Sequence, residues 1–239
     1  DLHSFPTRRS SDLNAGHGSM IHEDNPVTML AEAVARLGRH QFPMVLTESV
    51  KEFLQGIGEL TGLTFDEEDM DGSVAKLGPL SRAVGATLRD TANPTMLNAG
   101  YKANVIPSVA EATVDCRILP GRQQAFEREL DEILGPDVER EWITHLPPVE
   151  TTFDGELVDA MRAAIVAEDP QARTLPYVLS GGTDAKAFHT LGIRCFGFSP
   201  LKLPPDLDFT ALFHGVDERV PVDAIKFGTR VLDRFLRTC

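Results

Sequence analysis

Several short polar strings in this sequence contain residue types that can do chemistry. His214 is followed by Gly215, and a histidine beside a glycine can bring its imidazole close to a metal ion without crowding from the backbone. Neutral imidazole is a good zinc ligand, and Asp217 or Glu218 could orient it through a hydrogen bond. A loop histidine by itself is more often structural or exposed, so this string indicates a candidate ligand only.

Two other strings contain glycine next to polar groups. His17 lies between Gly16 and Gly18, which leaves its ring exposed and sterically free, although a flexible entry loop explains the same pattern. Residues 180–184 read SGGTD between an expected strand and an expected helix. Free backbone N–H groups at a helix N-terminus attract carboxylates and phosphates. A tight turn with Thr183 as the helix N-cap would also suffice.

Asn104 and Arg117 flank an expected strand–turn–strand with Pro107 in the turn. An arginine guanidinium on a sheet face can hold a carboxylate with two hydrogen bonds. The commoner fate of such an arginine is an ion pair with a neighbouring acid, here Asp115.

Other reaction classes lack their patterns. Neither G-x-G-x-x-G nor the P-loop pattern is present, which argues against nucleotide binding. A serine hydrolase using Ser180 and His189 would need the G-x-S-x-G elbow, which is absent. The acidic residues 66–72 lack the alternation and the later glutamate of an EF-hand.

Hydrophobic periodicity predicts the elements that position these residues. One helix is expected to begin at Asn25-Pro26, one after Gly121 and one at 222. Further helices are expected over 48–60, 74–88 (with a break near Pro79), 154–168 and 184–191. Strands are expected at 95–101, 110–118, 138–144, 175–179 and 193–198. Residues 110–118 alternate strictly, which places Asp115 and Arg117 on one polar face. We therefore expect an α+β segment, with helices beside an antiparallel sheet, up to Pro147 and an α/β layer after it.

Composition limits the function classes. The 239 residues carry a net charge of −13, whereas phosphate binding needs clustered Lys and Arg, so a nucleic-acid partner is excluded. Three cysteines without C-x-x-C spacing argue against a disulfide framework and indicate a reducing compartment, the cytoplasm. No apolar run is long enough to span a bilayer, so no membrane partner is expected.

The first residues look foreign to the rest of the chain. Residues 3–13 read HSFPTRRSSDL, which resembles a common short-read sequencing adapter translated in one frame. We therefore expect residues 1–13 to be an adapter-derived artefact and exclude them from the fold prediction. A natural basic tail is the alternative.

Five motifs in order carry a family resemblance: GHGS at 16–19 followed by NP at 25–26, NVIP at 104–107, DCRILPG at 115–121, SGGTDAKAF at 180–188 and HGVDERV at 214–220. Together they resemble the zinc amidohydrolase superfamily of acetylornithine deacetylase, succinyl-diaminopimelate desuccinylase, aminoacylase and glutamate carboxypeptidase. That family has a catalytic domain with two zinc ions and an inserted lid domain that mediates dimerisation. The resemblance implies that residues 14–147 are the lid and that residues 148–239 are the C-terminal part of the catalytic domain.

The resemblance also implies roles for single residues. His214 would be a zinc ligand, and His17 would reach the active site of the partner subunit and stabilise the tetrahedral oxyanion. Asn104 and Arg117 would hold the substrate carboxylate or carbonyl, also across the dimer. Gly182 and Thr183 would line the product side.

The other metal ligands of the family have no counterpart here. His22-Glu23-Asp24 spells the family's H-x-D, but it lies inside the lid, and Glu67-Glu68 is better explained as a solvated acidic run. We therefore expect a fragment of a hydrolase that cleaves peptides or N-acyl amino acids with metal-activated water, and that is inactive alone. A non-catalytic dimerisation or binding module derived from the family is the alternative.

Overall fold

The computed structural model describes residues 3–8, 15–213 and 215–238. Its described residues form two compact units, each assembled from three stretches of the chain. Unit 1 comprises Asp1–Val45, Ala86–Val149 and Leu179–Thr190, and unit 2 comprises Leu46–Gly85, Glu150–Val178 and Leu191–Cys239. Within the described residues no helix is long and apolar enough to cross a membrane.

Unit 1 is built on an antiparallel sheet of four strands in the order β3-β5-β1-β6. These strands are β3 (Thr91–Ala99), β5 (Ala110–Arg117), β1 (His3–Arg8) and β6 (Glu139–Arg140). A second, two-stranded ladder joins β2 (Gly16–His17) to β4 (Val105–Ile106). The expected alternation of β5 is confirmed, because every second residue from Ala110 to Cys116 is buried.

The sheet includes residues that the sequence-based prediction had excluded. β1 pairs with β5 from His3 opposite Cys116 to Arg8 opposite Glu111, and its last two residues also pair with β6. Leaving residues 3–8 out of the fold was therefore wrong, because their backbone completes the sheet between β5 and β6. The adapter origin of residues 1–13 stays a prediction.

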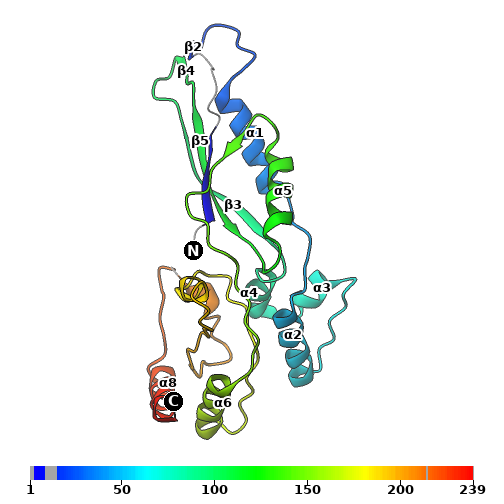
Figure 1. Ribbon diagram of the computed structural model, residues 1–239, viewed down its shortest axis with the longest axis vertical. Coiled ribbons are helices and arrows are strands. Elements are labelled where there is room, and N and C mark those ends of the chain that lie inside the picture. Colours follow the sequence, from blue (N-terminus) through cyan, green and yellow to red (C-terminus); the bar gives the residue numbers. More distant parts are fainter. Residues whose placement is uncertain (1–2, 9–14, 214, 239) are drawn as a thin grey trace. The chain divides into compact units, whose positions relative to one another are not determined.

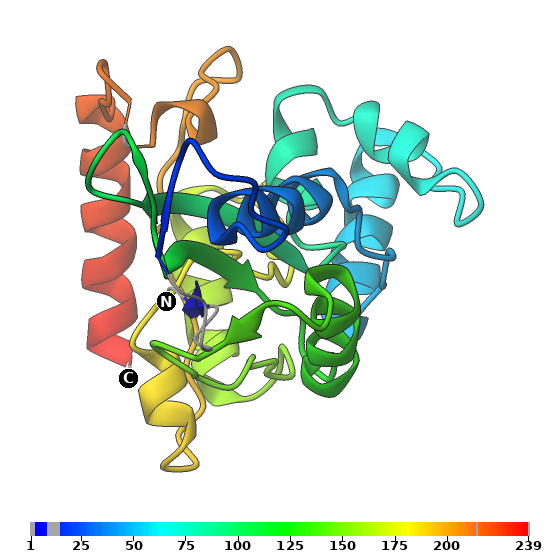
Figure 2. The same cartoon turned by 90° about the horizontal axis from the view of Figure 1, so that it is seen from above.

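Two helices cover one face of the sheet, α1 (Pro26–Arg39) and α5 (Gln123–Leu134) (Figures 1 and 2). The Asn25 side chain accepts a hydrogen bond from Val27 N at 3.0 Å, and Pro26 starts α1, as expected. The core beneath the helices consists of buried residues from both helices and the sheet: Ala33, Leu37, Phe42, Ala92, Val114, Cys116, Ile118, Phe126, Leu130 and Leu134.

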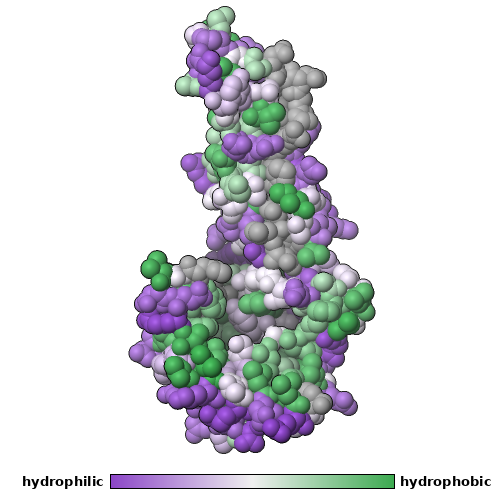
Figure 3. Space-filling model, turned by 90° about the vertical axis from the view of Figure 1, so that its left-hand side faces the viewer, coloured by the Kyte–Doolittle hydropathy of each residue, from purple (hydrophilic) through white to green (hydrophobic). Residues whose placement is uncertain are grey.

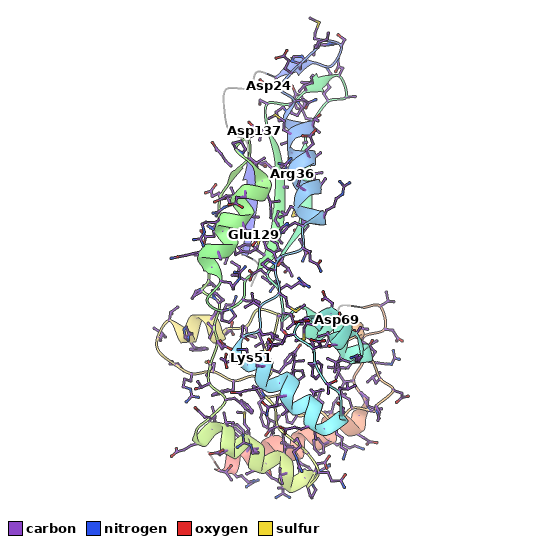
Figure 4. The ribbon with its side chains drawn as sticks, turned by 90° about the vertical axis from the view of Figure 1, so that its right-hand side faces the viewer. Asp24, Arg36, Lys51, Asp69, Glu129 and Asp137 are labelled. Atoms are coloured by element: carbon purple, nitrogen blue, oxygen red, sulfur yellow. The ribbon has the colours of Figure 1, made fainter. Side chains whose placement is uncertain are left out.

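Side chains also tie the two helices together. The Arg36 guanidinium on α1 donates to the Ile133 and Leu134 carbonyls at 2.8 and 2.7 Å, where α5 ends and its last carbonyls lack helical partners. Figure 4 shows Arg36 on α1 and Glu129 on the neighbouring α5. Glu129 accepts from His40, which follows α1, at 2.8 Å. These contacts fix the helix pair on the sheet that carries the predicted site residues.

Unit 2 consists of helices and extended segments. Its helices are α2 (Glu48–Thr61), α3 (Met70–Ala75), α4 (Ser81–Gly85), α6 (Glu156–Glu168) and α8 (Val222–Thr238), with the short 3-10 turns η1 (Gly78–Leu80) and η2 (Thr210–Leu212). The helix expected over 74–88 is thus divided into short pieces around Pro79. In unit 1, the helix expected to run to 191 is α7 (Ala185–His189).

Helices α6 and α8 pack together through small and medium apolar residues. Val158, Met161 and Ala164 on α6 are buried, as are Ala224 and Val231 on α8. Arg230 and Arg234 of α8 both donate to the Glu168 carboxylate at the end of α6, at 2.7 and 2.5 Å. These hydrogen bonds hold the pKa of Glu168 below its usual value.

The two strands expected in the C-terminal part do not form. Residues 175–179 and 193–198 carry no strand. A strand is defined by hydrogen bonds to a neighbouring strand, and an apolar run without such a neighbour stays extended. The observed architecture is therefore mixed, with helices and small antiparallel sheets. This agrees with the α+β arrangement expected up to Pro147. The division into a lid (14–147) and a catalytic part (148–239) stays a prediction, since unit 2 also takes in 46–85.

Candidate functional site

The ladder between β2 and β4 brings His17 to Asn104. His17 pairs with Val105 across the ladder, and Gly18 N donates to the Asn104 carbonyl at 2.9 Å. The side chains then meet, with Asn104 Nδ2 at 3.3 Å from His17 Nε2. His17 and Asn104 thus form one polar pair, although they are 87 positions apart and belong to separate sequence motifs.

Of the two glycines beside His17, Gly16 has a steric reason. At Gly16 a Cβ atom would collide with the imidazole of His22, which lies against the Gly16 backbone. His22, the first residue of the H-x-D string, therefore packs inside the same loop. His17 itself is exposed, and its Nδ1 contacts Ser19 Oγ at 2.7 Å.

Arg117 lies at the other end of β5. It donates to both carboxylate oxygens of Asp115, from Nε at 2.6 Å and from Nη2 at 2.9 Å. This is the ion pair that the sequence offered as the commoner alternative. Its Nη1 points to the Ser180 carbonyl at 3.4 Å. The Arg117 side chain is 29% exposed, and Asp115 sets the orientation of its guanidinium.

The loop that holds Gly182 and Thr183 is thereby placed beside Arg117. Thr183 Oγ1 accepts from Ala185 N at 3.3 Å, but the N-cap of α7 is Asp184 and not Thr183, as the turn interpretation had it. Lys186 on α7 lies close enough to Arg117 to be affected by its positive charge. Its pKa is lowered, mainly by burial and further by the positive charge of Arg117. The end of β5 and this loop thus bring two cationic side chains, Arg117 and Lys186, near one another, with Arg117 paired to Asp115.

The structure separates the two groups of predicted substrate residues. Asn104 directly precedes β4, ahead of the start of β5 at Ala110, whereas Arg117 is the last residue of β5. Seven strand steps of about 3.4 Å put the two ends of β5 about 24 Å apart. One substrate carboxylate cannot contact Asn104 and Arg117 of the same chain. The sequence did not indicate this separation.

A metal site is not formed by the described residues. Among residues 3–8, 15–213 and 215–238 there is no group of three or more His, Cys, Asp or Glu side chains that could hold a metal ion. His214, the predicted zinc ligand, lies outside the described residues. Catalytic zinc normally has three protein ligands. The described residues therefore do not fit a catalytic metal.

The acidic candidates are accounted for by local structure. Glu67 and Glu68 are exposed, and the backbone N–H of Glu68 donates to Asp66 at 3.0 Å in the turn before α3. An open pocket of about 460 Å³ in unit 1 contains none of the predicted site residues; it is lined by Ala15, Asn98, Ala99, Gly100, Tyr101, Pro107, Ser108, Val109 and Glu111. We place no substrate there.

Sequence reasoning missed two residues near the predicted site residues. Ser19 was part of the GHGS string, but no role was given to it, although a serine two residues after a histidine can reach the imidazole ring. Lys186 was part of SGGTDAKAF, and no sequence signal indicated its proximity to Arg117. Both placements depend on backbone geometry that a motif does not contain.

Comparison with known proteins decides the family. The pattern of Peptidase family M20/M25/M40 matches residues 16–238. The chain belongs to this family. Among curated relatives, human N-fatty-acyl-amino acid synthase/hydrolase PM20D1 is 27% identical over 228 residues, which cover 89% of this chain and 44% of that protein. Aminoacylase-1 from Pongo abelii is 28% identical over 149 residues, covering 60% and 35%. The M20 chain thus spans less than half the length of these relatives.

Solved structures support the M20 fold. The M20 family metallo-carboxypeptidase Sso-CP2 from Sulfolobus solfataricus aligns with a TM-score of 0.59 and 17% identity, covering 98% of this chain and 57% of its own. The dipeptidase Dug1p from Saccharomyces cerevisiae aligns with a TM-score of 0.62 and 12% identity, covering 98% and 53%. At this identity the likeness concerns the fold alone.

Proposed function

We propose that this M20 chain is part of a hydrolase that cleaves the amide bond of peptides or N-acyl amino acids, and that it supplies groups that bind the substrate. The observation that carries the proposal is the pairing of His17 with Asn104 in a chain whose residues 16–238 match the family. The relatives named as hydrolase and aminoacylase support amide substrates. His17 would donate a hydrogen bond to the oxyanion that forms when the carbonyl is attacked.

The Arg117 end would bind the substrate carboxylate. Asp115 binds the Nε–Nη2 edge of the guanidinium, and Nη1 is directed at the Ser180 carbonyl, in the loop of Gly182 and Thr183. A carboxylate there would receive a charge-assisted hydrogen bond from Arg117, and Gly182 and Thr183 would line its other side. Because the ends of β5 are far apart, His17 and Asn104 would act on the substrate of a partner subunit.

A homodimer is therefore part of the proposal, with residues 14–147 acting as the lid that joins the subunits. The exposed strand β3 supports this, because it ends the sheet order and its Met96 and Leu97 are 68% and 62% exposed. Open strand edges pair readily with other strands. Sedimentation should show a dimer for the wild type and a monomer for Leu97→Lys. A wild-type monomer at all concentrations would contradict the partner contact.

Zinc, expected as two ions in the intact protein, would be held by residues outside the described ranges, with His214 as one ligand. A rival proposal is a non-catalytic binding or dimerisation module derived from the family. Both proposals predict ligand binding, and only the first predicts hydrolysis once the remaining ligands are supplied.

Calorimetric titration with N-acyl amino acids carrying acetyl, succinyl and long acyl groups tests the Arg117 end. Arg117→Ala should weaken binding about tenfold or more, because a hydrogen bond to a charged group contributes about 1.5–3 kcal/mol. Arg128→Ala, an exposed arginine on α5, is the matched control and should bind as the wild type does. Equal affinities for wild type and Arg117→Ala would remove Arg117 from the binding site.

A further inference from the structure

The two ring nitrogens of His17 have different partners. Nδ1 receives the backbone N–H of Ser19 at 3.3 Å and contacts the Ser19 hydroxyl at 2.7 Å. Nε2 faces the side-chain amide of Asn104 at 3.3 Å. A neutral imidazole carries one hydrogen, so one nitrogen donates and the other accepts. The partners therefore determine which nitrogen is the donor.

The Ser19 backbone decides between the two tautomers. A hydroxyl can rotate to donate or to accept, but a backbone N–H can only donate. Its direction is fixed, because Gly18 N is bound to the Asn104 carbonyl at 2.9 Å and Met20 N closes a turn onto the His17 carbonyl at 3.0 Å. With the hydrogen on Nδ1, the Ser19 N–H would point at another N–H.

We infer that Ser19 is a positioning residue that holds His17 as the tautomer with its hydrogen on Nε2. In this state Nδ1 accepts from both Ser19 donors, and Nε2–H is the donor of the ring. Asn104 must then present Oδ1 to Nε2, with its amide turned so that Nδ2 points away. The orientation of an amide group is assigned from its hydrogen-bond partners. Here the Ser19 N–H determines the tautomer of His17, and that tautomer determines the orientation of the Asn104 amide.

The inference gives the proposed oxyanion donor a definite atom, and in this respect it rests on the proposed function. A substrate oxygen that replaces Asn104 Oδ1 would receive the Nε2–H without any proton rearrangement. A preorganised donor of this kind is effective because no reorganisation is needed when negative charge develops. The opposite tautomer would present a lone pair at Nε2 and would repel the oxyanion.

The test is ¹⁵N NMR of the histidine rings in the full chain without substrate, at a pH at which the ring is neutral. His17→Gln assigns the His17 resonances. The wild type should show a protonated Nε2 and an unprotonated, hydrogen-bonded Nδ1. A protonated Nδ1 would overturn the inference. This readout does not require hydrolysis, so its failure is distinguishable from failure of the proposed function.

Variants of Ser19 test its role. In Ser19→Ala the Nδ1 resonance should shift towards that of a histidine in an unstructured Gly-His-Gly peptide, because one of its two donors is lost. Ser19→Thr, which keeps both donors, should restore the wild-type spectrum. Ser108→Ala, a change at another exposed serine of unit 1, is the control and should leave it unchanged. A Ser19→Ala spectrum identical to that of the wild type would contradict the positioning role; circular dichroism checks that the variants fold.

Discussion

Similar apolar runs form a strand in unit 1 but not in unit 2. In unit 1 the alternating run of β5 lies between β3 and β1 and buries one face against α1 and α5. In unit 2 the apolar residues 193–198 have no strand partner, and many large apolar side chains of this unit are exposed. Apolar composition therefore does not make a strand; a partner for its hydrogen bonds does.

Unit 2 also has large apolar side chains at its surface. Figure 3 shows hydrophobic side chains at the surface of the part of the chain that contains α6 and α8. On α8 the exposed apolar residues follow helical spacing, with Ile225 at 50%, Leu232 at 38% and Leu236 at 70%. The helix thus has exposed apolar residues beside the face that packs on α6. Unit 1 should accordingly resist unfolding through its own core better than unit 2.

The largest expected effect comes from a substitution in the core of unit 1. Phe126 is fully buried between α5 and the sheet, so Phe126→Ala should lower the free energy of unfolding by about 3–5 kcal/mol. Trp142, the one tryptophan of the chain, packs against this core and reports its unfolding by fluorescence in urea. Phe188→Ala, at a residue 47% exposed in the same unit, should cost less than about 1 kcal/mol. Equal losses would show that the core is not where we place it.

A smaller effect is expected at a buried carboxylate, Asp90, that binds the loop after β5. Asp90 has no exposed side-chain surface and accepts from Leu119 N at 2.8 Å and from Arg122 Nε at 3.1 Å. Asp90→Ala should cost about 3 kcal/mol, because both donors lose their acceptor. Asp90→Asn, which keeps an acceptor for Leu119, should cost less. If both variants unfold as the wild type does, the loop is held by other contacts.

The same carboxylate should make stability depend on pH. Burial raises the pKa of Asp90, against the opposing effects of the Leu119 N–H and Arg122. The folded state then binds a proton more readily than the unfolded state, so this group's contribution falls as pH rises from the ordinary aspartate pKa to the raised one. Urea unfolding across that range should show a downward slope that Asp90→Asn reduces. An unchanged slope would place the pH dependence elsewhere.

The smallest effect is expected on the exposed face of α8. Leu236→Gln should change the free energy of unfolding by less than about 0.5 kcal/mol, because the side chain is largely solvated. It should lower the binding of a hydrophobic dye, because it removes exposed apolar area. A large loss of stability would mean that this face is packed and that the contrast between the units is weaker than described.

Much of unit 1 was predictable from local patterns. The start of α1 at Asn25-Pro26, the alternation of β5 and the helix after Gly121 all follow rules that act within a few residues. The sheet partners were not predictable, because the position of β1 between β5 and β6 depends on contacts far apart in sequence. For the same reason the pattern at 175–179 predicted a strand that the structure does not form.

The candidate site was predictable as a set of residues and not as an arrangement. The motifs pointed to His17, Asn104 and Arg117, but neither the pairing of the first two nor the position of Arg117 beside Ser180 is contained in their spacing. The ion pair between Arg117 and Asp115 was foreseen as an alternative, because alternating strand residues share a face. The role of Ser19 required the direction of a backbone N–H.

The most direct measurement is zinc content and hydrolysis of N-acyl amino acids by this chain, beside the chain extended upstream by its natural coding sequence. Our account predicts zinc and turnover in the extended protein only, and a loss of about 10²–10³ in kcat when His17→Ala removes the oxyanion donor. Stoichiometric zinc with turnover in the chain alone would contradict it, and would mean that the described residues bind the metal in an arrangement that the structure does not contain.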